Sequence, residues 1–219
     1  MDIGLTDKYA LVTGGSHGIG LSTALALADE GCNVAICTRN LKRVKAAVKS
    51  IQDKGVKSIG ISADAMVTGN IDRVIETIIS TWGTLHILIN NVGGGGRWGS
   101  ENVEETSEQV WMEVYNKNAL ASIRFTMRVL PFMRKQKWGR VVTVTSSLGI
   151  EGGGRPWFNM AKTAQTALMK NLALRHDLVR DGITFNSVAP GCIMIPDTGW
   201  DYERKKNTEK FEKFVQEKF

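Results

Sequence analysis

Short apolar runs alternate with longer amphipathic stretches along most of the chain. Six runs have the length and composition of buried strands: Tyr9–Thr13, Asn33–Cys37, Ser58–Ser62, Leu85–Ile89, Arg140–Thr145 and Ile183–Val188. Between them, apolar residues recur at helical spacing over residues 18–30, 40–54, 68–81, 105–136 and 156–180. We expect the fourth of these helices to break near Pro131. A charged helix is predicted to follow Pro190-Gly191 and to close the chain.

Strands that alternate with helices predict a parallel sheet covered on both faces. Right-handed crossovers then give a doubly wound α/β sheet, a Rossmann fold with three layers, α/β/α. In such folds ligands bind at the carboxyl ends of the strands. Because no linker, repeat or low-complexity tract interrupts the pattern, the 219 residues are predicted to form a single domain, residues 1–219.

Charge, cysteine content and apolar stretches restrict the kinds of ligand and the compartment that are expected for this chain. The net charge is +6, but Lys and Arg near the C-terminus are interleaved with Glu, which is typical of a solvated helix face and gives no support for nucleic-acid binding. The three cysteines form no CxxC pair, so we predict neither a disulfide framework nor a metal site. The sequence shows no signal peptide and no apolar stretch that would span a membrane. The expected compartment is therefore the cytoplasm.

A glycine-rich segment lies between the first predicted strand and the first predicted helix. Its glycines permit a tight turn and a close approach of the backbone to a ligand. The helix start beyond it offers free N–H groups to a pyrophosphate. The alternative is a merely structural turn. We expect the ligand contacts from Gly14, Ser16, His17, Gly18, Ile19 and Gly20.

The segment Thr13–Gly20, read as TGGSHGIG, resembles the TGxxxGxG loop of the short-chain dehydrogenase/reductase family. Further segments match that family in the same order: Ala63-Asp64, Asn90–Gly93, Asn118, Ser146, Lys162 and Pro190-Gly191. The resemblance implies an NAD(P)-dependent oxidoreductase that acts on a C–OH or C=O group of a small molecule, with sugars, 3-oxoacyl thioesters and small alcohols within reach. It also implies cofactor contacts from Asp64, Ala65, Asn91, Gly93, Lys162, Pro190, Gly191 and the backbone of Ile193.

The end of the second strand bears on the choice of cofactor. A carboxylate there would bind the ribose 2′-OH and repel a 2′-phosphate, but the residues are Cys37-Thr38-Arg39-Asn40. Arg39 can form charge-assisted hydrogen bonds to a phosphate, and by the resemblance His17 lies where family members often have a second basic residue. We therefore expect NADP(H) to be preferred, with NAD(H) possible. The alternative is that Arg39 is a solvated loop cation.

The catalytic pattern of the family is present with one departure. Family members use a Tyr that donates the proton, a Lys four residues later, a Ser that positions the carbonyl and an Asn that supports a proton relay. Here Ser146, Asn118 and Lys162 match, but Phe158 stands in place of the Tyr and has no hydroxyl. Among the tyrosines, Tyr202 alone lies where a mobile lid, residues 191–217, is expected.

The resemblance leaves three further expectations. The chain ends without the family's final strand, so the sheet is expected to lack it. Trp98, Trp157 and Trp200 either form an aromatic pocket around the nicotinamide or are ordinary packing residues. The helices at 105–136 and 156–180 would form the face of a C2 homodimer, where Ala161, Ala164 and Ala167 allow close approach.

Two functions are compatible with Phe158. The first is an NADP(H)-dependent oxidoreductase of the short-chain family whose turnover this residue impairs. The second is a catalytically weak or inactive NADP(H)-binding protein that serves as a sensor or scaffold. Phe158 favours the second reading, while Asn118, Ser146 and Lys162 favour the first.

Overall fold

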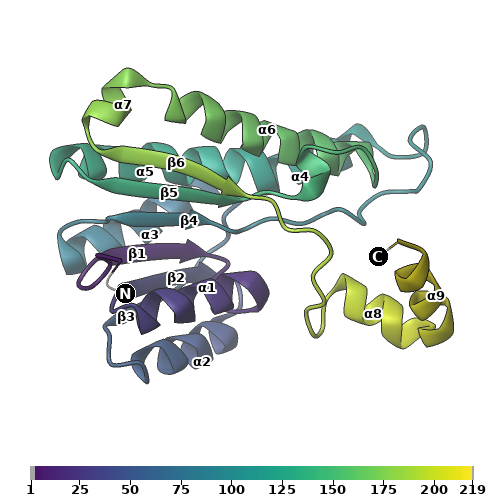
Figure 1. Cartoon of the computed structure of the whole chain (residues 1–219), viewed down its shortest axis with the longest axis horizontal. Coiled ribbons are helices and arrows are strands. Elements are labelled where there is room, and N and C mark those ends of the chain that lie inside the picture. The colour runs from purple at the N-terminus through teal and green to yellow at the C-terminus, as the bar shows by residue number, and fades with distance from the viewer. Residues whose placement is uncertain (1–2, 219) are drawn as a thin grey trace.

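Figure 1 shows the computed structural model of the protein, which describes residues 3–218. Its strands form one parallel sheet in the order β3-β2-β1-β4-β5-β6. The strand order reverses between β1 and β4, which confirms the predicted doubly wound fold and creates a crevice at the carboxyl ends of these two strands. The strands are β1 (Tyr9–Thr13), β2 (Asn33–Thr38), β3 (Ser58–Ser62), β4 (Ile87–Asn90), β5 (Gly139–Val144) and β6 (Ile183–Val188).

Helices cover both faces of the sheet. Neighbouring strand residues point to opposite faces, so Ala10 and Val12 of β1 pack with α1 (Gly18–Asp29) and α2 (Leu41–Gln52). Leu11 packs on the other face, which is covered by α3 (Thr68–Trp82), α5 (Ala121–Lys135) and α6 (Pro156–Ala173). The layers are therefore α/β/α, as predicted. Three shorter elements complete this part: α4 (Glu108–Tyr115), α7 (His176–Arg180) and the 3-10 turn η2 (Ser147–Gly149).

Two predicted helices differ from the structure. The segment predicted as 105–136 is α4 followed by a π-helical turn, η1 (Asn116–Leu120), and then α5. The predicted break at Pro131 is wrong, because α5 continues through it. Pro131 lies on the exposed side of the helix, where water can hydrate the Met127 carbonyl that loses its helical partner. The second segment, predicted as 156–180, is divided at residues 174–175 into α6 and α7.

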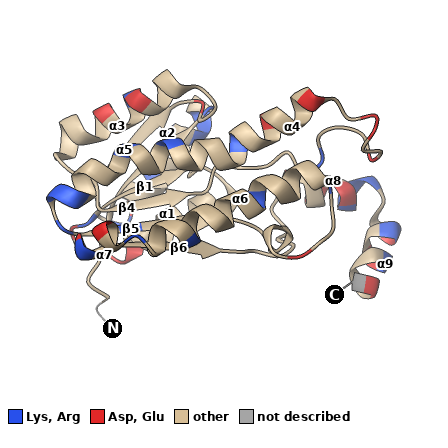
Figure 2. Ribbon diagram, turned by 90° about the horizontal axis from the view of Figure 1, so that it is seen from above, with Lys and Arg blue, Asp and Glu red and all other residues tan. Residues whose placement is uncertain are grey.

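The chain leaves the sheet after β6 and forms a helical pair, α8 (Gly199–Lys206) and α9 (Thr208–Lys218), where one closing helix was predicted. An aromatic cluster joins the two helices: Trp200 is stacked on Phe214, at 5.4 Å between ring centroids, and lies edge-to-face against Phe211, at 6.0 Å. Figure 2 shows basic and acidic residues interspersed along this pair. Among residues 3–218, no helix combines the length and apolarity needed to cross a bilayer.

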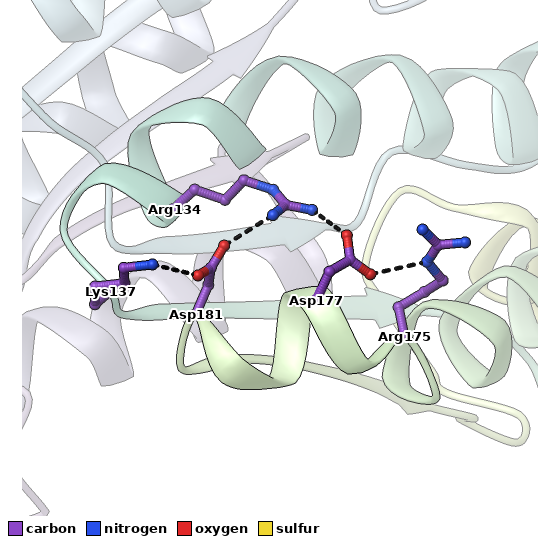
Figure 3. A network of polar contacts seen from close by, with 5 residues as sticks. All are labelled: Arg134, Lys137, Arg175, Asp177 and Asp181. Carbon is purple, nitrogen blue, oxygen red and sulfur yellow. Dashed lines mark hydrogen bonds and ion pairs between the residues drawn. The ribbon is translucent and has the colours of Figure 1, made fainter.

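At the end of the molecule away from the helical pair, an ion-pair network joins the end of α5 to α7 (Figure 3). Arg134 near the end of α5 binds Asp177 and Asp181, which also pair with Arg175 and Lys137. The hydrogen bond from Arg134 lowers the pKa of Asp177 to about 2, and the bond from Lys137 lowers the pKa of Asp181. Because both pKa values are depressed, the network stabilises the fold at neutral pH and loses this contribution as the pH falls from about 4 toward 2.

Candidate active site

The loop between β1 and α1 requires a glycine at position 14, and the first turn of α1 requires one at position 20. Gly14 has a φ of +66°, in the left-handed region, and its N–H donates to the Cys37 carbonyl at 2.8 Å. At Gly20 a Cβ would stand 2.4 Å from the Gly14 carbonyl oxygen. The helix α1 follows His17, whose side chain makes no capping hydrogen bond with the described residues. The first N–H groups of α1 are thus left for an anion.

Asn91 braces this loop against the end of β4. Its side-chain Nδ2 donates to the Thr13 carbonyl at 2.9 Å, and its backbone N–H donates to the Thr13 hydroxyl at 2.9 Å. The same hydroxyl accepts from the Val92 N–H at 3.0 Å. The carboxyl ends of β1 and β4 are therefore fixed to each other at the point where the strand order reverses.

A cavity of about 220 Å³, the Arg39 cavity, opens beside the loop. Arg39 follows β2, and its guanidinium pairs with none of the described residues. Lys117 faces the same cavity, and burial together with the charge of Arg39 lowers its pKa. Asp64 is the carboxylate of the lining, and its Oδ1 accepts from the Met66 N–H at 2.9 Å. Gly14, Thr38, Ala63, Ala65, Met66, Asn91, Val92 and Gly93 complete the wall.

Lys162 lies buried on α6, behind the cavities. Its Nζ donates to the Val144 carbonyl at 3.0 Å and stands 5.7 Å from the centroid of the Phe158 ring. Burial lowers the pKa of Lys162 from its ordinary value near 10.5 to about 8. The side chain is close to the glycine run after β4, Gly93–Gly96, since a Cβ on Gly93 would stand 3.0 Å from Nζ. A buried amine with a lowered pKa is characteristic of functional sites.

Asn118 lies within the π-helical turn η1 and is fully buried. Its Nδ2 donates to the carbonyls of Val114 and Gly94, at 2.7 and 2.8 Å, and its Oδ1 accepts from the Gly94 N–H at 3.1 Å. Its own carbonyl accepts from Gln165 Nε2 at 3.2 Å. Asn118 therefore ties η1 to the glycine run and to α6, and its place in a π turn is typical of functional positions.

A second cavity, the Phe158 cavity, has a volume of about 580 Å³. Phe158 and Ser146 line it together with Trp98 and Trp200, so two of the three tryptophans form an aromatic pocket at this point. Trp157 does not, because it is fully buried edge-to-face against Trp111 at 5.3 Å. The Ser146 hydroxyl accepts from the Leu148 N–H at 3.2 Å, which leaves its own proton for a ligand.

The remaining candidates line the Phe158 cavity or a third hollow, or lie in the loops beside them. Gly191 lines the Phe158 cavity, while Gly18, Ile19 and Ile193 line a third hollow between α1 and the segment after β6. The Pro190 carbonyl accepts from the Ser147 N–H at 3.1 Å, and Ser16 is buried in the loop. Tyr202 is exposed on α8 and lines none of these three.

Comparison with known proteins agrees with this geometry. The family described as short chain dehydrogenase matches residues 8–207 of the chain. A 3-oxoacyl-[acyl-carrier-protein] reductase, FabG, of Staphylococcus epidermidis is 35% identical over 191 residues, which cover 86% of this chain and 76% of that protein. The chain belongs to the short-chain dehydrogenase family.

Solved structures of this family share the fold. The L-sorbose reductase of Gluconobacter frateurii, complexed with NADPH and L-sorbose, is 29% identical with a TM-score of 0.88, over 99% of this chain and 82% of that one. An NAD⁺-bound xylitol dehydrogenase is 28% identical with a TM-score of 0.83, over 92% and 75%. A short-chain dehydrogenase is an oxidoreductase that acts on CH–OH groups, which agrees with the enzyme class expected from the sequence.

The structure of this short-chain dehydrogenase also shows residues that sequence reasoning missed. Lys117 precedes Asn118 directly, and its position beside that motif was an available signal. Gln165 supports Asn118 from one turn beyond Lys162, but a glutamine inside a helix carries no signal of its own. Within residues 3–218, no group of three or more His, Cys, Asp or Glu side chains is arranged to hold a metal ion.

Proposed function

We propose that this short-chain dehydrogenase binds NADP(H) in preference to NAD(H) and interconverts a small carbonyl compound and its alcohol, with turnover limited by Phe158. One observation supports this above all. The Arg39 cavity and the Phe158 cavity lie on either side of the glycine run, with Lys162 beneath it. One extended molecule can therefore reach both the anion site at Arg39 and the Phe158 cavity, whose wall includes Ser146.

The residues present fit a nicotinamide dinucleotide. The backbone at Gly14 and Gly20 leaves no space for a Cβ on the cradle, and the start of α1 presents N–H groups. Arg39 and Lys117 supply two cations for a 2′-phosphate, with no carboxylate at the end of β2. Asp64 and Ala65 would meet the adenine, and Gly191 and Ile193 the nicotinamide end. When bound, the reduced cofactor supplies the hydride that the carbonyl carbon accepts.

The other groups of the site act on the carbonyl oxygen. Reduction adds a hydride to carbon and a proton to oxygen, so the oxygen needs a donor while its charge develops. The Ser146 hydroxyl can donate a hydrogen bond to that oxygen from the wall of the Phe158 cavity. Asn118 holds η1 against the glycine run, and Lys162 brings a positive charge to within reach of position 158. Phe158 itself donates no proton, which is why we expect slow turnover.

Phe158 also favours one rival function, an NADP(H)-binding sensor or scaffold. Turnover separates the two. We would measure NADPH oxidation by the wild-type protein over a panel of aldehydes and ketones, beside a titration of cofactor binding. Slow but saturable oxidation supports the enzyme, whereas tight cofactor binding with no oxidation on any substrate supports the rival.

We place the protein in the cytoplasm, where the thiols of Cys32, Cys37 and Cys192, none of which forms a disulfide, would stay reduced.

Cofactor preference depends on Arg39. Arg39→Asp should weaken NADPH binding by about 1.5–3 kcal/mol, because it removes a charged hydrogen bond and adds repulsion. NADH binding should change far less. The measurement is a fluorescence titration of both cofactors against wild type, Arg39→Asp and Arg73→Asp, a control on α3 outside the Arg39 cavity. Equal affinity of the wild type for NADH and NADPH would show that the preference is wrong.

We also propose a C2 homodimer formed through α4, α5 and α6. Exposed methionines lie on each of these helices: Met112, Met127 and Met160 are 57%, 64% and 43% exposed. The expectation that Ala161 lines this face is wrong, since Ala161 is fully buried within the chain against Val114 and Trp157. Light scattering should give twice the 24.1 kDa chain mass, and Met127→Glu should shift it toward the monomer. A monomer alone or a firm tetramer would contradict this proposal.

A further inference from the structure

The Phe158 cavity has an unbalanced charge. Two guanidinium groups, Arg97 and Arg155, are part of its lining, and no carboxylate of the described residues is. Guanidinium groups remain charged at every pH at which a protein is folded. The cavity therefore holds two positive charges that its own walls do not neutralise.

Arg155 is held in place by the backbone of the loop that faces it. Its Nη1 donates to the carbonyls of Trp98 and Gly99, at 2.6 and 2.5 Å. Its Nε and Nη2 have no hydrogen-bond partner within residues 3–218. Arg155 is also the N-cap residue directly before α6, and the first turn of α6 contains no acidic side chain. An anion beside Arg155 would thus meet a fixed cation and the positive end of a helix of 18 residues.

Arg97 comes from the opposite side, where the glycine run approaches the helical pair. Its guanidinium lies over the ring of Trp200, 4.9 Å from the centroid. Its Nε stands 3.9 Å from Glu203, a carboxylate that lies outside the Phe158 cavity and is half exposed. A pair at this distance between exposed groups is weak, so Arg97 keeps most of its capacity to bind an anion.

Apart from Ser146, Ser147 and Cys192, the rest of the lining consists of aromatic and aliphatic side chains and glycines. Trp98 and Trp200 lie near the two arginines, and Leu148 and Phe158 cover the side toward α6. A neutral polyol would leave both cations unpaired and would cover little of this apolar surface. A planar or acyl body that bears an oxyanion would satisfy both features at once.

We infer that the substrate is an anionic carbonyl compound, or the matching alcohol: an apolar, preferably aromatic body with a carboxylate or phosphate group that Arg97 and Arg155 bind. This inference rests on the proposed function, because it names the substrate class of the same site. It assigns the carbonyl to the part of the cavity beside Ser146 and the oxyanion to the space between Arg97 and Arg155.

Three aryl ketones with the same acetylphenyl body test it: 4-acetylbenzoate, 4-acetylphenyl phosphate and 4-acetylbenzamide, which is the neutral isostere of the benzoate. Their dissociation constants are measured by calorimetry on the full chain, with and without NADP⁺. We expect an anionic probe to bind wild type at least about tenfold more tightly than the amide, which corresponds to one charged hydrogen bond. The tighter of benzoate and phosphate identifies the oxyanion.

Variants then locate the anion. Arg155→Gln and Arg97→Gln should each weaken the preferred anion about tenfold and leave the amide within about twofold, and Arg155→Lys should recover part of the loss. Arg180→Gln, which removes the same charge from α7, is the matched control and should change nothing. Each of these variants must bind NADPH as tightly as the wild type does, which shows that its fold is intact.

Each failure has its own meaning. Equal affinity of wild type for the anions and the amide overturns the inference, as does binding of no probe while NADPH binds normally; the proposed function stands in both cases. Equal losses for anion and amide in the arginine variants also overturn it, since they indicate a structural role. Absence of NADPH binding overturns the proposed function instead, and the anion preference is then read from the titrations without cofactor.

Discussion

Replacing Phe158 by tyrosine should raise the rate of NADPH-dependent carbonyl reduction by about 10²–10⁴-fold, the usual contribution of a well-placed general acid. The ring of Phe158 forms part of the wall of the Phe158 cavity beside Ser146, so a hydroxyl at its far end would face a bound ketone. The Lys162 Nζ, 5.7 Å from the ring centroid, would favour the phenolate and lower the pKa of the new phenol. A tyrosine here would need little repacking, because the residue is only half-buried.

The measurement compares NADPH oxidation by wild type and Phe158→Tyr on the same ketone, with equal cofactor affinity established first. Phe158→Leu is the matched control: it changes the ring without adding a hydroxyl and should give no gain. Adding Ser146→Ala to Phe158→Tyr should remove most of the gain, since the carbonyl is then no longer oriented. An unchanged rate in Phe158→Tyr would contradict the prediction, and a wild type that already works at ordinary enzyme rates would show that another group donates the proton.

The fold was predictable because its signals are local and repeated. Strands such as Tyr9–Thr13 are short apolar runs bounded by glycine or charge, and each alternates with a helical period. The predictions of secondary structure were wrong where tertiary contacts, and not the local sequence, determine the backbone conformation. Pro131 does not break α5, because the buried faces of Phe125, Val129 and Met133 hold the helix and the lost bond faces solvent. No local pattern marks η1 as a π turn.

The candidate site was predictable to the extent that it follows a motif. Residues of the glycine loop, Asp64, Ser146 and Phe158 each line one of three cavities near the carboxyl ends of the strands, where parallel sheets bind ligands. What the sequence leaves open is which side chains outside the motif meet there. Trp98 and Trp157 look equivalent in the sequence, but the first lines a cavity and the second fills a core. Arg97 and Arg155 are 58 positions apart in the sequence, and only the folded chain places both in the lining of the Phe158 cavity.

Replacing Lys162 by methionine should have opposite effects on activity and stability. In the Phe158→Tyr background it should abolish most of the gained rate, about 10²-fold or more, because the phenol loses the charge that lowers its pKa. In the wild-type background, without cofactor, Lys162→Met should raise the free energy of unfolding. Lys162 is buried without an acidic partner among the described residues, and its one hydrogen bond goes to the neutral Val144 carbonyl.

The pKa of Lys162 determines that Lys162→Met is stabilising, and it sets the pH range in which this stabilisation is expected. Below pH 8 the amine is charged in both the folded and the unfolded chain, so the folded state bears the full cost of a buried charge. Between pH 8 and 10.5 the folded chain releases its proton while the unfolded chain keeps it, so the stability of the wild type rises with pH. The advantage of Lys162→Met should therefore be greatest at neutral pH and shrink above pH 8.

Two effects determine how much Lys162→Met stabilises the protein at neutral pH. The lowered pKa corresponds to a cost of a few kcal/mol, and loss of the bond to Val144 offsets about 1 kcal/mol of the gain, which leaves on the order of 1–2 kcal/mol. Urea unfolding of wild type and Lys162→Met at pH 7 and pH 9.5 measures it, with Lys170→Met as the control from the exposed side of the same helix. A destabilised Lys162→Met at pH 7, or an advantage that grows with pH, would show that Lys162 is held for the fold. A stabilised but inactive variant would show that the chain keeps a buried charge at this position for chemistry, at the expense of its own stability.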